Sequence, residues 1–194
     1  MTAQLRDGTE VEVRPVEPAD KQALLAAFER LGPKSRYQRF LAPMPRLTDA
    51  TLRYLTEVDH HDHEALVAVE PSTRAGLGIA RFVRLADRPD VAEAAVTVVD
   101  DQQGRGLGTL LLHRLADRAR EEGVERFWAL LLSDNREMLD LLERLGPVHV
   151  VGRGAGTLEV EVELPEEGVG GLRDLLRAAA RGVVDAVVGS TGRP

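Results

Sequence analysis

The 194-residue sequence contains no cysteine, only two lysines (Lys21 and Lys34) and 4% aromatic residues. Without cysteine, disulfides, thiolate metal sites and a cysteine acyl-enzyme are excluded. No apolar run approaches the roughly 20 residues that span a bilayer, and residues 1–7 lack the apolar core of a secretory signal. The net charge of −7 argues against general nucleic-acid binding, which usually needs a basic protein. We therefore expect a cytoplasmic protein with neither nucleic-acid nor membrane partners.

The first half of the chain combines short helices with strands that alternate or run apolar. The length suits one domain, and 43% apolar with 29% charged residues is typical of globular proteins. The patterns predict a strand at 9–14, a helix from Asp20 to about Leu31, a helix after Thr48-Asp49, paired strands at 65–69 and 77–85, and a buried strand at 91–99. The composition of residues 35–40 does not decide their structure.

The second half predicts helices and strands in turn, closed by a hairpin. Apolar spacing predicts a helix over 106–122, and a buried strand follows at 127–132. Asp134 and Glu137 resemble a capping box for a helix that ends at Gly146. Residues 148–153 and 157–163 predict a hairpin. The fold class is therefore α/β, with a mixed, mostly antiparallel central sheet flanked by helices.

The composition changes after Leu164-Pro165. Leucine, alanine and valine recur on one helical face between residues 172 and 187, with arginines outside that face. This pattern predicts a C-terminal amphipathic helix that packs on the domain or on a second subunit, so a homodimer is one expectation; a membrane-surface helix is the lesser alternative. We expect a domain at 9–164 and a helical extension with a frayed tail at 165–194.

A glycine-rich segment joins the strand at 91–99 to the following helix. It reads Gln103-Gly104-Arg105-Gly106-Leu107-Gly108-Thr109. Free N–H groups and the positive end of the helix dipole favour an anion at a helix start, and glycines allow close approach of phosphate. No Gly-Lys-Ser/Thr is present, and Thr109 occupies the third glycine position of the dinucleotide fingerprint. A ligand-free glycine turn is the structural alternative, although glycines are unfavourable in helices.

The spacing Gln103-x-x-Gly106-x-Gly108 resembles the pyrophosphate loop of the GNAT superfamily of N-acetyltransferases, and the likeness extends over roughly residues 9–164. The resemblance implies that residues 103–109 hold the pyrophosphate of acetyl-CoA. It also implies that the backbone of Val98 and Val99 pairs with the pantetheine amides, and that Asn135 meets the pantetheine arm. Shorter segments at 35–37, 58–63 and 92–96 look like bacterial protein lysine acetyltransferases of the Pat type.

Glu93 is the candidate catalytic base, because an alkylammonium must lose a proton before it can attack. It interrupts a run of alanine and valine, and family members carry a glutamate at the equivalent place; partial burial would raise its pKa. The alternative is a carboxylate exposed to water. Without cysteine, direct attack in a ternary complex is the expected mechanism.

Leu142 occupies the position at which many family members place a tyrosine that protonates the leaving thiolate. Water or Ser133 would have to replace that acid. We expect an acetyltransferase whose acceptor is an amine, a protein lysine being favoured over a small molecule. A weak or inactive acyl-CoA-binding sensor is the alternative function. His60, His61, Asp62 and His63 could suggest a metal, but a solvated loop or a lip of the substrate site is favoured, so no metal is predicted.

Overall fold

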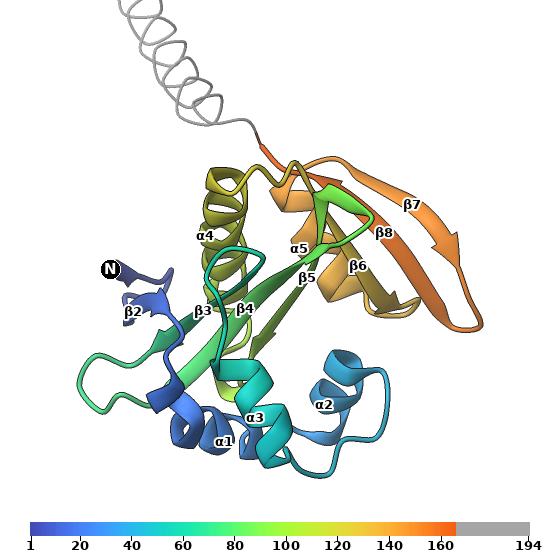
Figure 1. The fold of residues 1–194 in the computed structure, drawn as a ribbon. Helices are drawn as coiled ribbons and strands as arrows, with labels where there is room; N and C mark the ends of the chain where they lie inside the picture. The colour runs from blue at the N-terminus through green and yellow to red at the C-terminus, as the bar shows by residue number, and fades with distance from the viewer. Residues whose placement is uncertain (166–194) are drawn as a thin grey trace, which may run out of the picture. The chain divides into compact units, whose positions relative to one another are not determined.

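The structure is a computed structural model that describes residues 1–165. These residues form one eight-stranded sheet with the strand order β1-β2-β3-β4-β5-β6-β8-β7 (Figure 1). The strands are β1 (Thr2–Gln4), β2 (Glu10–Pro15), β3 (His63–Val69), β4 (Gly76–Leu85), β5 (Arg88–Val98), β6 (Arg126–Leu132), β7 (Val148–Arg153) and β8 (Thr157–Glu163). Only β5 and β6 are parallel neighbours in the described sheet. The predicted mixed, mostly antiparallel sheet is confirmed.

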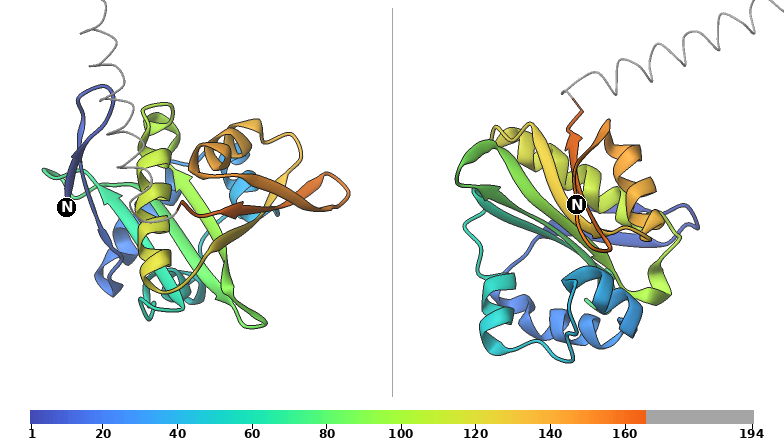
Figure 2. Two further views of the ribbon diagram at one scale, coloured as in Figure 1. Left: turned by 90° about the horizontal axis from the view of Figure 1, so that it is seen from above. Right: turned by 90° about the vertical axis from the view of Figure 1, so that its right-hand side faces the viewer.

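Helices cover both faces of the sheet (Figure 2). One face carries α1 (Lys21–Glu29), α2 (Pro33–Phe40) and α3 (Asp49–Thr56), and the other carries α4 (Leu107–Glu121) and α5 (Arg136–Leu145). Alternation along the strands explains this division, since Ala80 and Phe82 pack with α4 while Ile79 packs on the opposite face. No helix within residues 1–165 combines the length and the apolar character needed to cross a membrane.

Most predicted elements are confirmed, and three local predictions need correction. The strand β1 lies upstream of the predicted domain start at residue 9 and pairs with β2 from Thr2 opposite Glu12. Residues 35–40, left undecided by their composition, lie in α2, which begins at Pro33. Asn135, and not Asp134, caps α5, because its Oδ1 accepts from Met138 N at 3.2 Å. The predicted C-terminal helix and tail lie outside the described residues.

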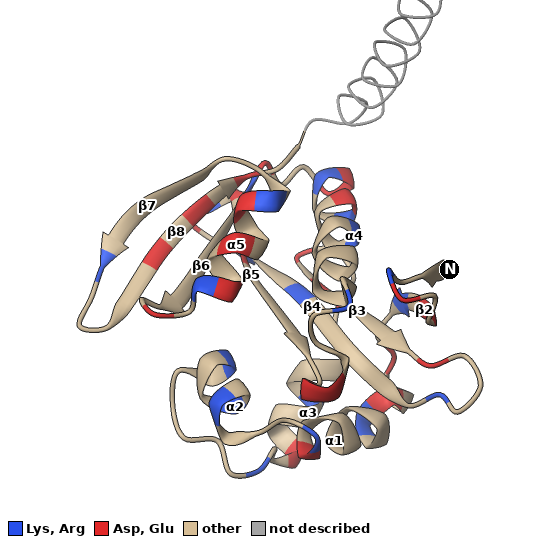
Figure 3. Ribbon diagram, turned by 180° about the vertical axis from the view of Figure 1, so that it is seen from behind, with Lys and Arg blue, Asp and Glu red and all other residues tan. Residues whose placement is uncertain are grey.

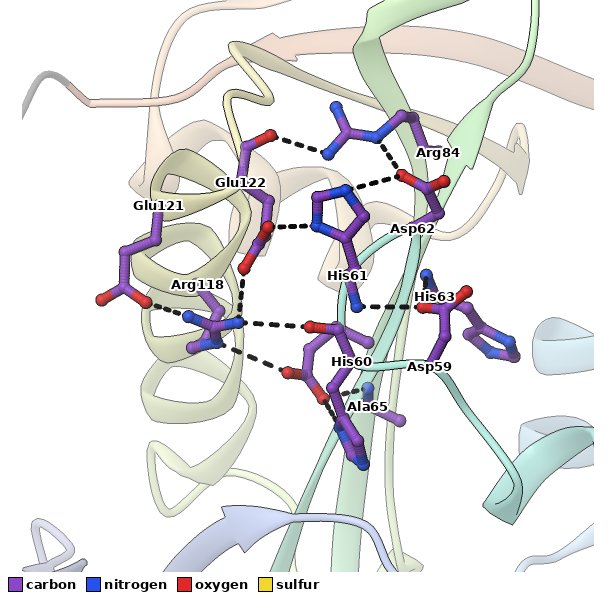
Figure 4. A network of polar contacts seen from close by, with 11 residues as sticks. Asp59, His60, His61, Asp62, His63, Ala65, Arg84, Arg118, Glu121 and Glu122 are labelled. Atoms are coloured by element: carbon purple, nitrogen blue, oxygen red, sulfur yellow. Dashed lines mark hydrogen bonds and ion pairs between the residues drawn. The ribbon is translucent and has the colours of Figure 1, made fainter.

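A network of polar contacts ties the histidine segment to the C-terminal end of α4 (Figure 4). Glu64, 1% exposed, lies 2.8 Å from His60 Nδ1 and 3.4 Å from Arg118 Nε. His61 contacts Glu122 of the same helix. The side chains of His60, His61 and Asp62 stay exposed, so the expected solvated loop is found, and its polar contacts anchor it to α4. The His63 ring lies 5.0 Å from that of Tyr54. Nowhere in residues 1–165 do three or more potential ligands gather as a metal site.

Replacing Glu64 with alanine is expected to lower the free energy of unfolding by about 2 kcal/mol, because a buried carboxylate and its charge-assisted hydrogen bonds are lost. Glu121→Ala is the matched control: it removes an exposed partner of the same Arg118 guanidinium and should cost at most about 0.5 kcal/mol. Urea unfolding of both variants gives the comparison. Equal losses would show that the buried carboxylate has no special role in holding β3 to α4.

Candidate functional site

The sheet opens between β5 and β6. Their parallel pairing covers only three positions and ends where Glu93 lies opposite Trp128. Beyond that pair β5 stays bonded to β4 and β6 stays bonded to β8, so the two halves of the sheet diverge. Residues 94–98 and 128–131 line the resulting cleft, which has a volume of about 850 Å³. The facing strand edges leave backbone N–H and C=O groups available to an extended ligand.

The glycine loop closes one end of this cleft. Gly104 and Gly106 adopt left-handed φ angles of 77° and 92°, which L side chains rarely take. Gly106 is the N-cap of α4, and the first helical hydrogen bond runs from Leu110 N to its carbonyl at 3.0 Å. The N–H groups ahead of Leu110 therefore have no intrahelical acceptor and form an anion-binding helix start.

Gly108 requires a different explanation, because its φ is not left-handed. An added Cβ would lie 3.4 Å from Leu141 Cδ2 and 3.8 Å from Val98 Cγ2, which is ordinary van der Waals contact. Alanine would also favour the helix by about 1 kcal/mol. Neither the backbone nor the neighbouring side chains demand glycine here.

Neighbouring elements fix the loop in place. Arg30, directly after α1, donates two hydrogen bonds of 2.7 and 2.8 Å to Asp101, and this contact lowers the pKa of the Asp101 carboxyl. Asp100 accepts from Gly32 N at 2.9 Å. Gln103 Nε2 donates to Val98 O at 3.0 Å, so this side-chain amide holds the turn between β5 and α4.

The structure brings most of the predicted cofactor residues to the cleft. Those that line it are Val98, Gln103, Gly104, Gly106, Gly108, Thr109 and Asn135. Three predicted residues do not line it. Val99 is buried and its N–H donates to Leu77 O at 3.0 Å, so it is not available to a pantetheine amide. Arg105 pairs with Asp7 at 3.2 Å, and Leu107 is a core residue that offers only its backbone.

Glu93 lines the cleft at the point where β5 and β6 separate. Its side chain is exposed, so the expected partial burial is not found. The reason is the ending of the strand pairing, which opens this position to the cleft. The carboxylate therefore lies beside the space in which two substrates could meet.

Asn135 and Leu142 come to the cleft from α5. Asn135 is 7% exposed, and its side-chain oxygen caps the helix by accepting from Met138 N. Leu142 also lines the cleft and is buried, so no acid stands at that position. Ser133 is absent from the cleft lining among the described residues.

Three arginines that were not predicted from the sequence line the cleft, namely Arg6, Arg39 and Arg144. Arg6 comes from the turn after β1, and its Nε lies 3.4 Å from the position that a Cβ on Gly106 would occupy. Arg39 comes from α2, whose charged residues are all basic (Figure 3). The sequence could have pointed to Arg6 as a cleft residue only if the three-residue strand before it had been recognised. It could have pointed to Arg39 only if α2 had been recognised. Arg6 and Arg39 each place a cation at one end of the cleft.

Arg6→Gln is expected to weaken binding of acetyl-CoA about fivefold, since Arg6 places a charged donor against the glycine loop. The matched control is Arg105→Gln, which should change the dissociation constant less than twofold because Arg105 already pairs with Asp7. Calorimetric titration at two salt concentrations tests this, because a phosphate contact should weaken as ionic strength rises. An Arg6 variant that binds like the wild type at low salt would remove this residue from the site.

Comparison with known proteins supplies independent information on the chain. A family model described as an acetyltransferase (GNAT) domain matches residues 10–148. Acetyltransferase Pat of Mycolicibacterium smegmatis is 37% identical over 188 residues, which are 95% of this chain and 56% of that protein. This chain thus spans about half of that relative's length.

Solved structures agree with the family model. The GNAT domain of S. lividans PAT matches with a TM-score of 0.79 at 31% identity, over 84% of this chain and 96% of that one. A putative acetyltransferase of Salmonella typhimurium, yncA, determined with acetyl-CoA, matches with a TM-score of 0.64 over 82% of this chain and 96% of that one. At 24% identity the second likeness concerns the fold alone.

Proposed function

We propose, from the premise that this chain belongs to the GNAT acetyltransferase family, that it transfers the acetyl group of acetyl-CoA to an amine. The observation that carries the proposal is the opening of β5 and β6 onto a helix start built from glycines. Acetyl-CoA would supply an activated acyl thioester. The other requirements, which are binding, orientation and proton removal, fall to the residues of the cleft.

The glycine end and the middle of the cleft suit a long anionic ligand. Its glycine end offers the free N–H groups of α4 and the Arg6 guanidinium to a pyrophosphate. Its middle offers the unpaired edge of β5, where Val98 remains the candidate partner of the pantetheine amides. The absence of a Cβ on Gly108 leaves room for close approach. These features support the assignment of residues 103–109 as the cofactor loop.

Glu93 is proposed as the base that takes a proton from the acceptor amine, directly or through water. Its exposed carboxylate opens onto the cleft and is able to exchange that proton with solvent. Transfer forms an N–C bond and breaks the C–S bond, and the thiolate then takes a proton from water. Because a thiol of this kind has a pKa near about 8.5, the leaving group does not need the tyrosine that Leu142 replaces.

Two classes of acceptor are supported by different observations. The Pat-like segments and the 37% identity to acetyltransferase Pat support a protein lysine. Small amines are supported by the enclosed cavity that α1, α2 and α3 cover beside Ala95 and Thr97 of β5. The transfer chemistry at Glu93 is the same for both classes.

The test is titration of the full chain with acetyl-CoA, followed by a screen of amine acceptors that measures release of the free thiol. Saturable binding with turnover on some amine supports the proposal. Binding without turnover on any peptide or small amine would favour the acyl-CoA-binding sensor. Lack of binding at millimolar acetyl-CoA would overturn the cofactor assignment.

A further inference from the structure

A second cavity lies beside the cleft, between the sheet and helices α1 to α3. Its volume is about 60 Å³, several times the roughly 10–15 Å³ that one water needs. Arg39, Phe40, Ala95 and Thr97 line both this cavity and the cleft, so the two spaces adjoin. Most of the remaining wall is apolar. The cavity therefore offers space for an apolar group on the face of the sheet that carries Glu93.

The polar end of this cavity contains a buried arginine without an anion. Arg81 lies opposite Ala95 in the register of β4 and β5, and it is 5% exposed. Its Nη2 donates to Leu55 O at 2.9 Å, whereas Nε and Nη1 are buried and have no partner within residues 1–165. Thr97 Oγ1 is also buried without a partner there. A buried charge that lacks its hydrogen bonds is costly, so these atoms call for a ligand.

The groups that surround Arg81 do not supply the missing negative charge. Burial, and then the neighbouring charge of Arg39, lower the pKa of Arg81 to about 10. Burial, and then Arg81, lower the pKa of His63 to about 4, so this ring is neutral at pH 7. Asp20 at the far wall is engaged by Arg14 at 2.6 Å. Tyr54 offers only its ring face, 5.3 Å from the Arg81 guanidinium.

Glu93 is the remaining acidic neighbour of Arg81, and it lines the cleft that adjoins the cavity. It occupies the same face of β5 as Ala95, one diagonal step from Arg81. The negative charge of Glu93 acts to raise the pKa of both Arg39 and Arg81. The charge of Arg39 affects the pKa of Arg81 more strongly than Glu93 does. The guanidinium groups of Arg39 and Arg81 therefore have the same exposed carboxylate, that of Glu93, as their acidic neighbour. The face retains an excess positive charge next to the proposed base.

We propose that this cavity binds the carboxylate and the side chain of the acceptor, so that the acceptor is a small apolar amino acid acetylated on its α-amine. The inference rests on the proposed function and narrows its acceptor class. Arg81 keeps unpaired N–H donors on Nε and Nη1, and its charge with either donor suits a carboxylate. Thr97 Oγ1 adds a donor, the apolar wall takes the side chain, and the α-amine points to Glu93. A protein lysine offers no carboxylate beside its amine.

The experiment compares L-valine and L-leucine with their amides as acceptors of the full chain at saturating acetyl-CoA. The amides keep the amine and the side chain but lose the charge that Arg81 binds. We expect kcat/KM to be at least tenfold higher for the acids. Arg81→Gln should lower kcat/KM for the acids ten- to a hundredfold through KM, with the values for the amides unchanged. Arg81→Lys, which keeps the charge but loses the planar set of guanidinium donors, should fall between the two.

Arg53→Gln is the matched control, since Arg53 is exposed on the adjoining helix α3 and lies outside both cavities. An unchanged dissociation constant for acetyl-CoA shows that each variant is folded. Equal use of acids and amides, or a lysine peptide whose acetylation is insensitive to Arg81, would overturn the inference while leaving the proposed function standing. Binding of acetyl-CoA with no transfer to any amine would overturn both.

Discussion

Glu93→Gln is expected to lower kcat at least a hundredfold and to leave the dissociation constant of acetyl-CoA unchanged. General base catalysis typically contributes a factor of about 10²–10⁴, and glutamine preserves shape while it cannot accept the proton. The carboxylate lies where β5 and β6 part, and it lines the cleft between them. The loss should therefore appear in the chemical step and not in cofactor binding.

The measurement is a pH–rate profile of both proteins with the best acceptor from the screen. In the wild type kcat/KM should fall on the acid side as the base and the amine become protonated. In the Glu93→Gln variant, the part of this fall in kcat/KM that is due to protonation of the base should be absent. Glu125→Gln, an exposed glutamate ahead of β6, is the control and should change kcat less than twofold. A Glu93 variant with an undiminished rate and profile would assign proton removal to water alone.

Gly108→Ala is expected to weaken acetyl-CoA binding at least tenfold without destabilising the fold. The Cβ has space within the protein, and alanine favours the helix by about 1 kcal/mol. The same methyl group would occupy the place at which a phosphate approaches the helix start. Affinity and stability should therefore move in opposite directions, and this combination distinguishes a binding glycine from a structural one.

Gly123 provides the opposite case at the other end of α4. Its φ of 78° is left-handed, and an added Cβ would meet nothing within 4 Å. Gly123→Ala should lower the free energy of unfolding by about 1 kcal/mol through backbone strain and leave binding unchanged. Calorimetry and thermal unfolding of both variants complete the comparison. If Gly108→Ala binds acetyl-CoA normally, the glycine loop is a turn and not a phosphate site.

The local elements could be predicted because their signals lie within short stretches of sequence. The hairpin at 148–163 and the loop that enters α4 have patterns that no distant contact overrides. The separation of β5 from β6 could not be predicted in this way, because it depends on which strands become neighbours. The strand β1 has three residues, too few for a period, and forms through its pairing with β2.

The acceptor side shows the same limit. An arginine in an alternating strand is ordinarily assigned to the solvent face, yet three helices cover the face that carries Arg81. Likewise, the sequence of the exposed histidine loop could not show that His60 contacts Glu64 and that His61 contacts Glu122 at the end of α4. Both cases are settled by packing between segments that are far apart in the sequence.

The short pairing of β5 with β6 also bears on how occupancy and folding are linked. Three register positions join the two halves of the sheet, so a ligand that bridges both edges would act as the missing strand between them. A molecule that binds only the folded state adds RT ln(1 + [L]/Kd) to its stability, about 2.7 kcal/mol at a hundredfold excess over Kd. The lifetime of the folded chain would then rise and fall with the supply of its own acyl donor.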